Sequence, residues 1–467
     1  MKKVCEKQVF KMVRDMTEGK PSSLILRFCL PLMAGNLFQQ FYNMVDSIIV
    51  GRFVGKDALS AMGCVGSLHF LVIGSIIGLC TGFAIPVSQC FGANDFAKMR
   101  KYIANLVYLS AVISVIVSLL TYFGTEWLLR ILNTPESLIP DAKTYISIIF
   151  LGIPATVLYN SVACLIRAVG DSKTPLYFLI FSSVINIGLD LLFVIQFGMG
   201  VMGVAVATVI AQALSGILCL YYIHRSFPLL HLQKGDMRPN AECCQKLLYA
   251  GLPMALQFSI TAIGSVMLQS CVNELGSDAI AAMTIAGKTQ LIIVLPAETI
   301  GLTLATFCGQ NLGAKRVDRI SQGTRNGLCM AFVYSVIGAV IARCFGRYIM
   351  MLFVSASETV VLDYGMQFLR INSALYAVLV IIFVLRNALQ GMGFSIPAMT
   401  AGLFELIARG TVGFVFVRRF GYAAACWANP AAWFAADLFL IPMYLYVMHK
   451  FKTVPDFLRI RSEKSYE

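Results

Sequence analysis

The sequence predicts an all-α integral membrane protein of about twelve transmembrane helices, arranged as two related bundles of six. Three observations support this class. Hydrophobic residues make up 58% of the 467 residues, and charged residues only 13%. Apolar stretches long enough to cross a bilayer recur along the chain. The two halves of the chain also share short motifs at a nearly constant separation.

The apolar stretches locate the individual spans. Predicted transmembrane helices cover residues 24–50, 59–84, 99–123, 138–165, 174–197, 201–223, 247–273, 279–307, 321–345, 359–385, 395–418 and 424–448. Each has the roughly 20 residues that a helix needs to cross the hydrocarbon core. A helix also satisfies every backbone polar group within itself, which lipid cannot do.

The net charge of +13 raises the question of nucleic-acid binding, but the positions of the basic residues argue against it. They lie in short loops beside apolar spans, as cytoplasmic loops do under the positive-inside rule. Loops that hold Lys98, Arg167, Arg225 and Arg316 are therefore placed inside. The basic start lacks the short apolar core of a signal peptide. We expect a multi-pass protein of the plasma (inner) membrane, with both termini cytoplasmic and no nucleic-acid partner.

The chain contains an internal repeat. GKDALSAM at residues 55–62 matches GSDAIAAM at 276–283, and QCFGA at 89–93 matches QNLGA at 310–314, both with a separation of 221 residues. Six spans in each half give both halves the same orientation, so the repeat is parallel, with a pseudo-twofold axis along the membrane normal. Two such bundles suit alternating access, in which the halves rock about a central site.

The repeat and the spans together divide the chain into five predicted regions. A cytoplasmic N-terminal tail (1–23) precedes the first lobe (24–223). A basic cytoplasmic linker (224–246) leads to the second lobe (247–448), and a cytoplasmic tail (449–467) ends the chain.

Two carboxylates fall inside predicted spans of the first half, with no basic residue deep in the same helix to pair with them. Asp46 shares a helix face with Gln39 and Asn43, and Asp190 follows Asn186 by four residues. An ionisable group at mid-membrane costs at least ~2.5 kcal/mol, so such residues usually serve a function. A buried, unpaired carboxylate takes up a proton or binds a cation. Either behaviour is what coupling to an ion gradient requires.

The second half lacks these acids. Positions equivalent to Asp46 hold Met267 or Leu268, and those equivalent to Asp190 hold Val412 or Gly413. The two halves therefore share a scaffold, whereas the ion-binding chemistry is predicted for the first half alone.

Other polar residues in the spans leave more than one interpretation open. Asn160 and Thr208 either join the acids in a polar cluster or only hold helices together by hydrogen bonds. Glu405 and Arg409, four residues apart, predict a self-neutralised structural pair. Glu298 is either a substrate contact or a loop-facing residue.

Enzyme chemistry is not predicted. The 4 His are scattered, and the 14 Cys include no pair with metal-ligand spacing. No glycine-rich segment has the strand-loop-helix setting that cradles a nucleotide phosphate. We expect no enzymatic activity, no organic cofactor and no metal beyond a sodium ion at the coupling site.

The combined motifs resemble the multidrug and toxic compound extrusion (MATE) family over roughly residues 20–450. The motifs that carry this likeness are Pro31…Gln39…Tyr42-Asn43…Asp46, the QxxGA turns at 89–93 and 310–314, Arg167 to Asp171 with Pro175, and Asn186 to Asp190. The likeness is closer to the bacterial branch known for DNA-damage-inducible F proteins. It implies a V-shaped pair of six-helix bundles.

The resemblance also implies a function, which is secondary active multidrug efflux. Small organic cations or amphipathic drugs would be exchanged against Na⁺ or H⁺ by alternating access. Carried over by motif, the ion site would comprise Asp46, Asn186, Asp190 and Thr208, and its occupancy would bend the first helix near Pro31. The lipid bilayer is the other expected partner, and a functional monomer is expected.

The substrate pocket is expected to include Gln39, Tyr42, Asn43, Asn160 and Glu298. Two alternatives stay open. One is a flippase for lipid-linked oligosaccharides from the same superfamily, although few Lys or Arg lie in the spans that would line its cleft. The other is a membrane receptor or binding protein without coupled transport.

Overall fold

The computed structural model describes residues 15–132, 134–233 and 235–454, and within these ranges every regular element is a helix. Ten of these helices are long and apolar enough to cross a membrane, and two bent helix pairs raise the number to twelve if each pair is one span. This confirms the predicted all-α membrane class and the number of spans. The terminal residues 1–14 and 455–467, parts of the two predicted cytoplasmic tails, lie outside the described residues.

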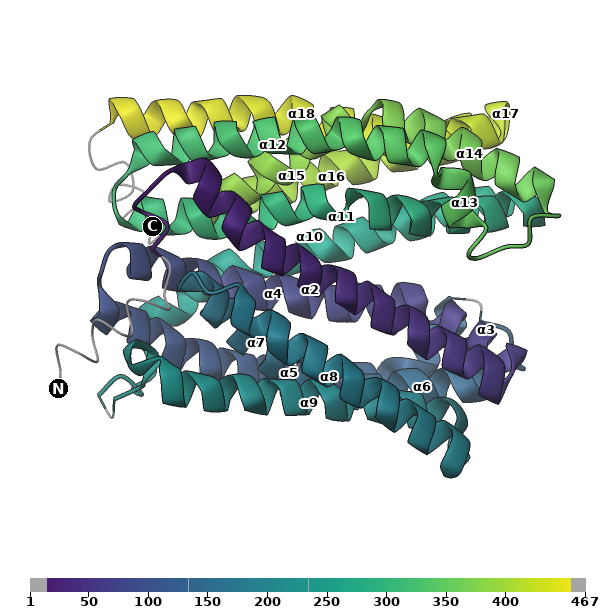
Figure 1. Cartoon of the computed structure of the whole chain (residues 1–467), viewed down its shortest axis with the longest axis horizontal. Coiled ribbons are helices and arrows are strands. Elements are labelled where there is room, and N and C mark those ends of the chain that lie inside the picture. Colours follow the sequence, from purple (N-terminus) through teal and green to yellow (C-terminus); the bar gives the residue numbers. More distant parts are fainter. Residues whose placement is uncertain (1–14, 133, 234, 455–467) are drawn as a thin grey trace. The chain divides into compact units, whose positions relative to one another are not determined.

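The helices follow the predicted order along the chain (Figure 1). Elements of the first half are α2 (Pro21–Ile49), η1 (Val50–Val54), α3 (Lys56–Cys64), α4 (Gly66–Gly92), α5 (Phe96–Ile131), α6 (Ile139–Leu151), α7 (Ile153–Ala168), α8 (Lys173–Leu191), η2 (Leu192–Gln196) and α9 (Gly200–Ser226). The linker contains η3 (Pro228–Leu230). Elements of the second half are α10 (Ala241–Asn273), α11 (Ser277–Gly313), α12 (Val317–Cys344), α13 (Gly346–Met350), α14 (Thr359–Ala374), α15 (Tyr376–Gly391), α16 (Ser395–Thr411), η4 (Val412–Val417), α17 (Arg418–Phe420) and α18 (Tyr422–Thr453).

The internal repeat extends to individual turns of the backbone. In the first QxxGA turn Asn94 has φ 55°, and in the second Lys315 has φ 58°. Gly170 (φ 92°) and Gly393 (φ 82°) likewise occupy equivalent helix ends, in a region that glycine tolerates without a steric penalty. Matching residues thus stop the helices at matching places in the two halves.

The two bent spans are also equivalent. Helices α6 and α7 meet at 47°, and α14 and α15 meet at 58°. A proline follows the first break, since Pro154 lies in the first turn of α7 and has no backbone N–H to continue the ladder. No proline marks the second break, so the shared bend belongs to the fold rather than to one residue.

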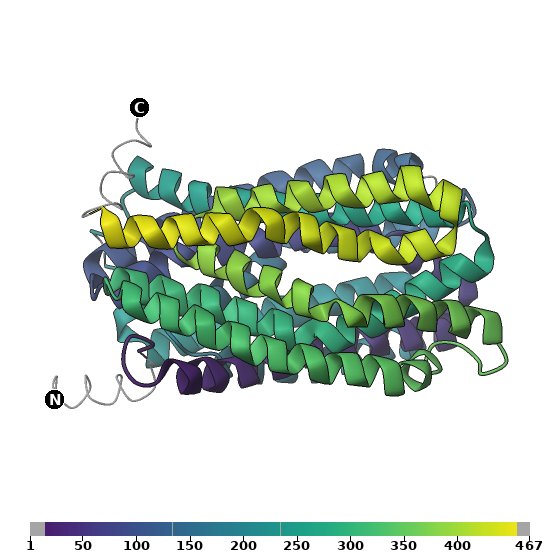
Figure 2. The same ribbon diagram turned by 90° about the horizontal axis from the view of Figure 1, so that it is seen from above.

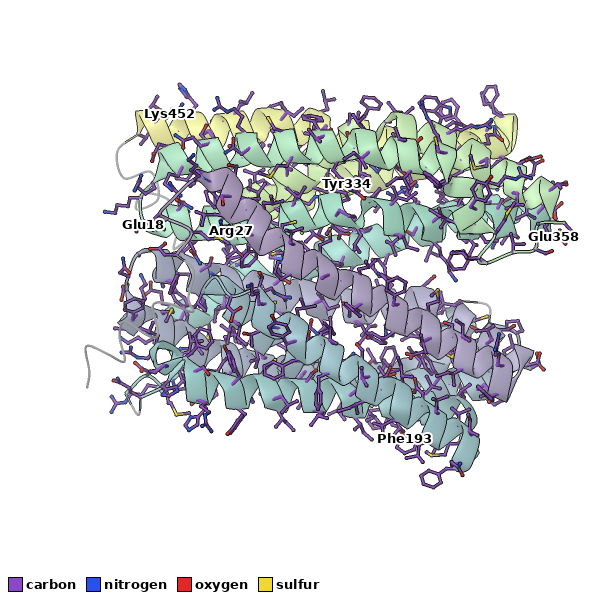
Figure 3. All side chains as sticks on the ribbon, viewed as in Figure 1. Glu18, Arg27, Phe193, Tyr334, Glu358 and Lys452 are labelled. Carbon is purple, nitrogen blue, oxygen red and sulfur yellow. The ribbon has the colours of Figure 1, made fainter. Side chains whose placement is uncertain are left out.

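Packing divides the chain into two compact units. The first unit contains Arg27–Ala262, and the second contains Met16–Leu26 together with the chain from Ile263 onward. Helix α2 therefore begins in the second unit and continues in the first from Arg27, which is labelled in Figure 3. Helix α10 likewise begins in the first unit and ends in the second. The predicted lobes are bounded by the sequence repeat, whereas these two units are defined by which residues are in contact, so their boundaries differ.

The segment before α2 is held by side chains of the second unit. Gln310 accepts a hydrogen bond from the backbone N–H of Met16 (2.9 Å), and Asn311 donates to the Met16 carbonyl (3.1 Å). The Arg319 guanidinium donates to the carbonyls of Met16 (3.2 Å) and Gly19 (2.9 Å). The second QxxGA motif thus supplies both a turn and partners for buried backbone groups.

The linker before α10 is held in a corresponding way by the first unit. Arg100 donates from Nε to Asp236 (2.9 Å), and Tyr108 donates to the Met237 carbonyl (2.8 Å). The side chain of Asn105 accepts from the backbone N–H of Asn240 (2.9 Å). Each half of the repeat therefore begins with a docked segment.

Close helix packing in the second unit leads to a first prediction. A Cβ added at Gly391, the last residue of α15, would overlap the carbonyl oxygen of Ala305 in α11 and lie 2.9 Å from its Cα. Because backbone atoms cannot rotate away, we expect Gly391→Ala to lower the free energy of unfolding by about 1–3 kcal/mol. The measurement is thermal unfolding of the purified protein in detergent. Gly287→Ala is the control, since a Cβ there meets nothing within 4 Å, and equal shifts would contradict the prediction.

Candidate functional site

The two acids singled out in the first half lie together in the first unit. Asp46, in the last turn of α2, is 6% exposed, and Asp190, in the last turn of α8, is fully buried. Their carboxyl groups interact directly with each other. Neither takes part in any of the ion pairs between described residues. Two buried acids side by side without a base form an arrangement that is suited to take up a proton or to hold a cation.

The local sequence explains why no base reaches this pair. Helix α2 has no Lys or Arg between Arg27 and the π-helical turn that contains Arg52. Helix α8 has none after Lys173, which opens the helix more than four turns before Asp190. The compensating groups are therefore polar and uncharged, and they come from neighbouring helices.

Tyrosine and glutamine side chains form this polar surround. The Tyr42 hydroxyl hydrogen-bonds with Gln39 in the preceding turn of α2 and with Gln212 of α9. Thr156 of α7 donates to Gln212 (2.5 Å), which fixes that amide. Tyr42 lies close enough to both acids to interact with them electrostatically, and so does Tyr145 of α6. Five helices therefore meet around the acid pair.

Several buried polar atoms at this site have no hydrogen-bond partner among the described residues. They are Oδ1 of Asp46, both carboxylate oxygens of Asp190, and both amide atoms of Asn186, which is one turn before Asp190. An unsatisfied buried polar atom costs roughly 1–3 kcal/mol, more when charged. Carboxylate and amide oxygens are the ligands that hard cations prefer. The donor set therefore fits either a proton or a small cation such as Na⁺.

The remaining predicted site residues form bonds within their own helices or lie exposed. Thr208 donates to the carbonyl of Val204 (2.9 Å), one turn earlier in α9, and Asn160 donates to the carbonyl of Thr156 (2.8 Å). The Asn43 side chain is exposed, although it shares the helix face of Asp46. Pro31 lies inside α2, which continues through it as one helix (Figure 1). Bending at Pro31 stays a prediction.

Sequence reasoning missed three members of the polar surround, namely Tyr145, Thr156 and Gln212. Gln212 follows Thr208 by one turn and is polar within an apolar span, so the search that selected Thr208 had the signal to find it. Tyr145 carries no such signal, because the chain has 18 Tyr and nothing local separates one from another.

The second unit contains a different charged cluster, to which Glu298 of α11 belongs. Glu298 is half-buried and interacts electrostatically with Arg386 of α15. Arg386 also donates to Glu405 of α16, whereas Arg409 lies 4.0 Å from Glu405. The predicted ion pair of Glu405 and Arg409 is present, but the pair is not neutralised within α16 alone, because Arg386 is the nearer base. The nearer base comes from another helix, and i, i+4 spacing alone cannot detect it.

Known proteins are similar to this chain along most of its length. The model of the family described as MatE matches residues 31–192 and 253–415, one match in each half of the repeat. A probable multidrug resistance protein, YpnP of Bacillus subtilis, is 31% identical over 84% of this chain and 87% of its own. The multidrug export protein MepA of Staphylococcus haemolyticus is 23% identical over 86% and 89%, respectively.

Solved structures show the same fold. A multidrug resistance MATE family transporter of the MOP superfamily, in an outward-facing conformation, superposes with a TM-score of 0.87 at 20% identity. That match covers 95% of this chain and 99% of the solved one. A MATE structure described as the straight conformation gives a TM-score of 0.85 at 20% identity, over 96% and 99%. The likeness extends over both units, so each has the helix arrangement of these transporters.

Proposed function

The chain belongs to the MatE family, and from this premise we propose that it is a multidrug exporter that exchanges organic cations or amphipathic compounds against Na⁺ or H⁺. The observation that carries the proposal is the pair of buried carboxylates, Asp46 and Asp190, without a basic partner. The curated relatives support the substrate class, since several are named for multidrug resistance or export. They are named as transport proteins rather than enzymes.

The acid pair would act as the coupling site. An ion that enters from outside neutralises the pair and relieves the repulsion between its two carboxylates. Because Asp46 lies on α2 and Asp190 on α8, occupancy changes the attraction between these two helices. A conformational change follows only from such a difference in binding free energy between two states. Loss of the ion inward resets the transporter.

The energy available is adequate for export. Each net charge that the exchange carries inward across a potential of about 100 mV releases ~2.3 kcal/mol, which sustains a substrate concentration ratio of about 50-fold. An electroneutral exchange uses the concentration gradient of the ion instead, and each tenfold step of that gradient is worth about 1.4 kcal/mol. No nucleotide is needed for this work. The lipid environment would be the plasma (inner) membrane, with both termini in the cytoplasm and the protein acting as a monomer.

Substrate contacts would come from the polar and aromatic groups near the acid pair. Gln39 and Tyr42 extend the site along α2, and a tyrosine face attracts an organic cation. Asn160, one turn from Thr156 on α7, extends it on another side. Asn43 is exposed and therefore accessible to a ligand. Glu298 is half-buried in the second unit, and we propose it as a separate substrate contact there.

A flux measurement in liposomes tests this function. The purified protein is reconstituted, a fluorescent organic cation is enclosed, and either a pure sodium gradient or a pure proton gradient is imposed. We expect export above the level of protein-free liposomes with one of the two gradients, and collapse of that gradient with an ionophore should stop it. Dye binding without flux under either gradient would contradict antiport and would favour a receptor.

A further inference from the structure

A cluster in the interior of the second unit brings together charged side chains from α15, α16 and α18 that are at least nine-tenths buried. Their exposed fractions are 8% for Arg386 of α15, 7% for Glu405 and 6% for Arg409 of α16, and 5% for Asp437 of α18. Half-buried Glu298 of α11 lies beside them. Helices α16 and α18 run side by side, as Figure 2 shows for the yellow-green and yellow helices, and α15 packs against both.

The hydrogen bonds of this cluster are unevenly distributed. Glu405 accepts from Nη2 of Arg386, and its second oxygen lies 4.0 Å from Nη2 of Arg409. Both carboxylate oxygens of Asp437 have no hydrogen-bond partner among the described residues. The Nε atoms of Arg386 and Arg409 also have none. The same cluster therefore contains buried acceptor and donor atoms that form no hydrogen bond with the described residues.

The charges of the cluster do not balance when every group is ionised, and this indicates which acid is neutral. With all groups ionised, the two arginines face three acids. Arg386 interacts electrostatically with Asp437 and Glu298, but its hydrogen bond goes to Glu405. An ionised carboxylate that is buried without a donor carries a penalty of several kcal/mol. Asp437 avoids this penalty when it is protonated, whereas Glu405 keeps its charge beside two arginines.

We propose that Asp437 is a second proton-binding site of this protein, independent of the acid pair in the first unit. In the protonated state, Asp437 is neutral and Arg386 is free to bond Glu405, which is the arrangement in the structure. When the proton leaves, the new carboxylate attracts Arg386 and its unpartnered Nε. The guanidinium is then shared between Glu405 and Asp437, and protonation controls how α15, α16 and α18 attract one another.

A proton fits this site better than a metal cation. Two guanidinium groups in the cluster repel any added cation. The described residues contain no group of three or more His, Cys, Asp or Glu that could hold a metal ion. Proton binding removes the charge of Asp437 and requires no further ligand.

Among the described residues, the electrostatic influence on Asp437 comes from Arg386 of α15. Segment η4 is Val-Gly-Phe-Val-Phe-Val, without a titratable group. From α14, Tyr364 stacks on Tyr422, four helical turns from Asp437. From α12, Thr324 lies near Tyr444. Glu405, Arg409 and Glu298 are connected to Asp437 through their shared interactions with Arg386.

Infrared difference spectroscopy on the purified full-length protein tests the proposal. Spectra are recorded as the pH is raised from acidic to alkaline, and the stretching band of protonated carboxyl groups is followed. We expect one component of this band to be missing in Asp437→Asn and to remain in the double variant Asp46→Asn/Asp190→Asn. Asp363→Asn is the matched control, since Asp363 is an exposed acid paired with Arg347 (2.8 Å), and it should keep the component.

Several outcomes would overturn the proposal. A band unchanged in Asp437→Asn would do so, as would loss of the component on addition of Na⁺ at constant pH, which would indicate a metal cation site. If Asp437→Asn does not fold, Asp437→Glu decides the question, because the component should persist at a shifted frequency. An unshifted component in that variant contradicts the assignment. No flux is measured, so failure of antiport and failure of this site are distinguishable.

Discussion

Asp190→Asn and, separately, Asp46→Asn should reduce the substrate concentration ratio that the protein sustains to about onefold, from about tenfold for one coupled ion at a tenfold ion gradient. Asparagine keeps the shape of the side chain but cannot take up or release a proton, and it binds a cation less strongly. The exchange with the ion gradient is lost, whereas downhill binding of substrate can persist. The measurement is dye export from liposomes under the gradient that drives the unaltered protein.

The fold should survive these two changes. Each removes one of two like charges that interact directly at a buried site, so the repulsion between the acids disappears. The matched control is Glu126→Gln, which changes an exposed acid paired with Lys143 (2.8 Å) and should leave export unaltered. Undiminished gradient-driven export in both aspartate variants would refute the coupling role.

Arg386→Met should lower the free energy of unfolding by about 3–5 kcal/mol, because it leaves Glu405 buried without its nearest base. Thermal unfolding of the purified protein in detergent measures the loss. The double variant Arg386→Met/Glu405→Gln should recover much of it, since removing both partners of a buried pair is often nearly neutral.

Two single variants provide the comparison for this prediction. Arg347→Met breaks an exposed pair with Asp363, and exposed pairs contribute about 0–1 kcal/mol. The loss of unfolding free energy in Arg409→Met should lie between the losses in Arg386→Met and Arg347→Met, because Arg409 is buried but lies 4.0 Å from Glu405. If Arg386→Met and Arg347→Met destabilise the protein equally, the assignment of Arg386 as the main partner of Glu405 is wrong.

The sequence alone was sufficient for the class of protein, the number and order of the spans, and the repeat. Apolar length is a local property, and a chain in lipid has few alternatives to a helix. The turns that end equivalent helices are also local, as Gly170 and Gly393 show by their shared positive φ. The two aspartates of the first half could be selected in advance for the same reason, since a charge within an apolar span is visible in the sequence.

Only the tertiary structure decided which side chains meet. Glu405 has Arg409 four residues away, yet its hydrogen bond comes from Arg386 on another helix. Tyr145 joins the acid pair from α6, although nothing in its own segment indicates it. Gln212 of α9 is visible as a polar residue in an apolar span, but its bond to Tyr42 is not. Asn43 has the right spacing from Asp46 but is exposed. Helical periodicity determines which residues share a face of one helix. Which residues of another helix contact that face depends on how the helices pack, and only the three-dimensional fold shows that packing.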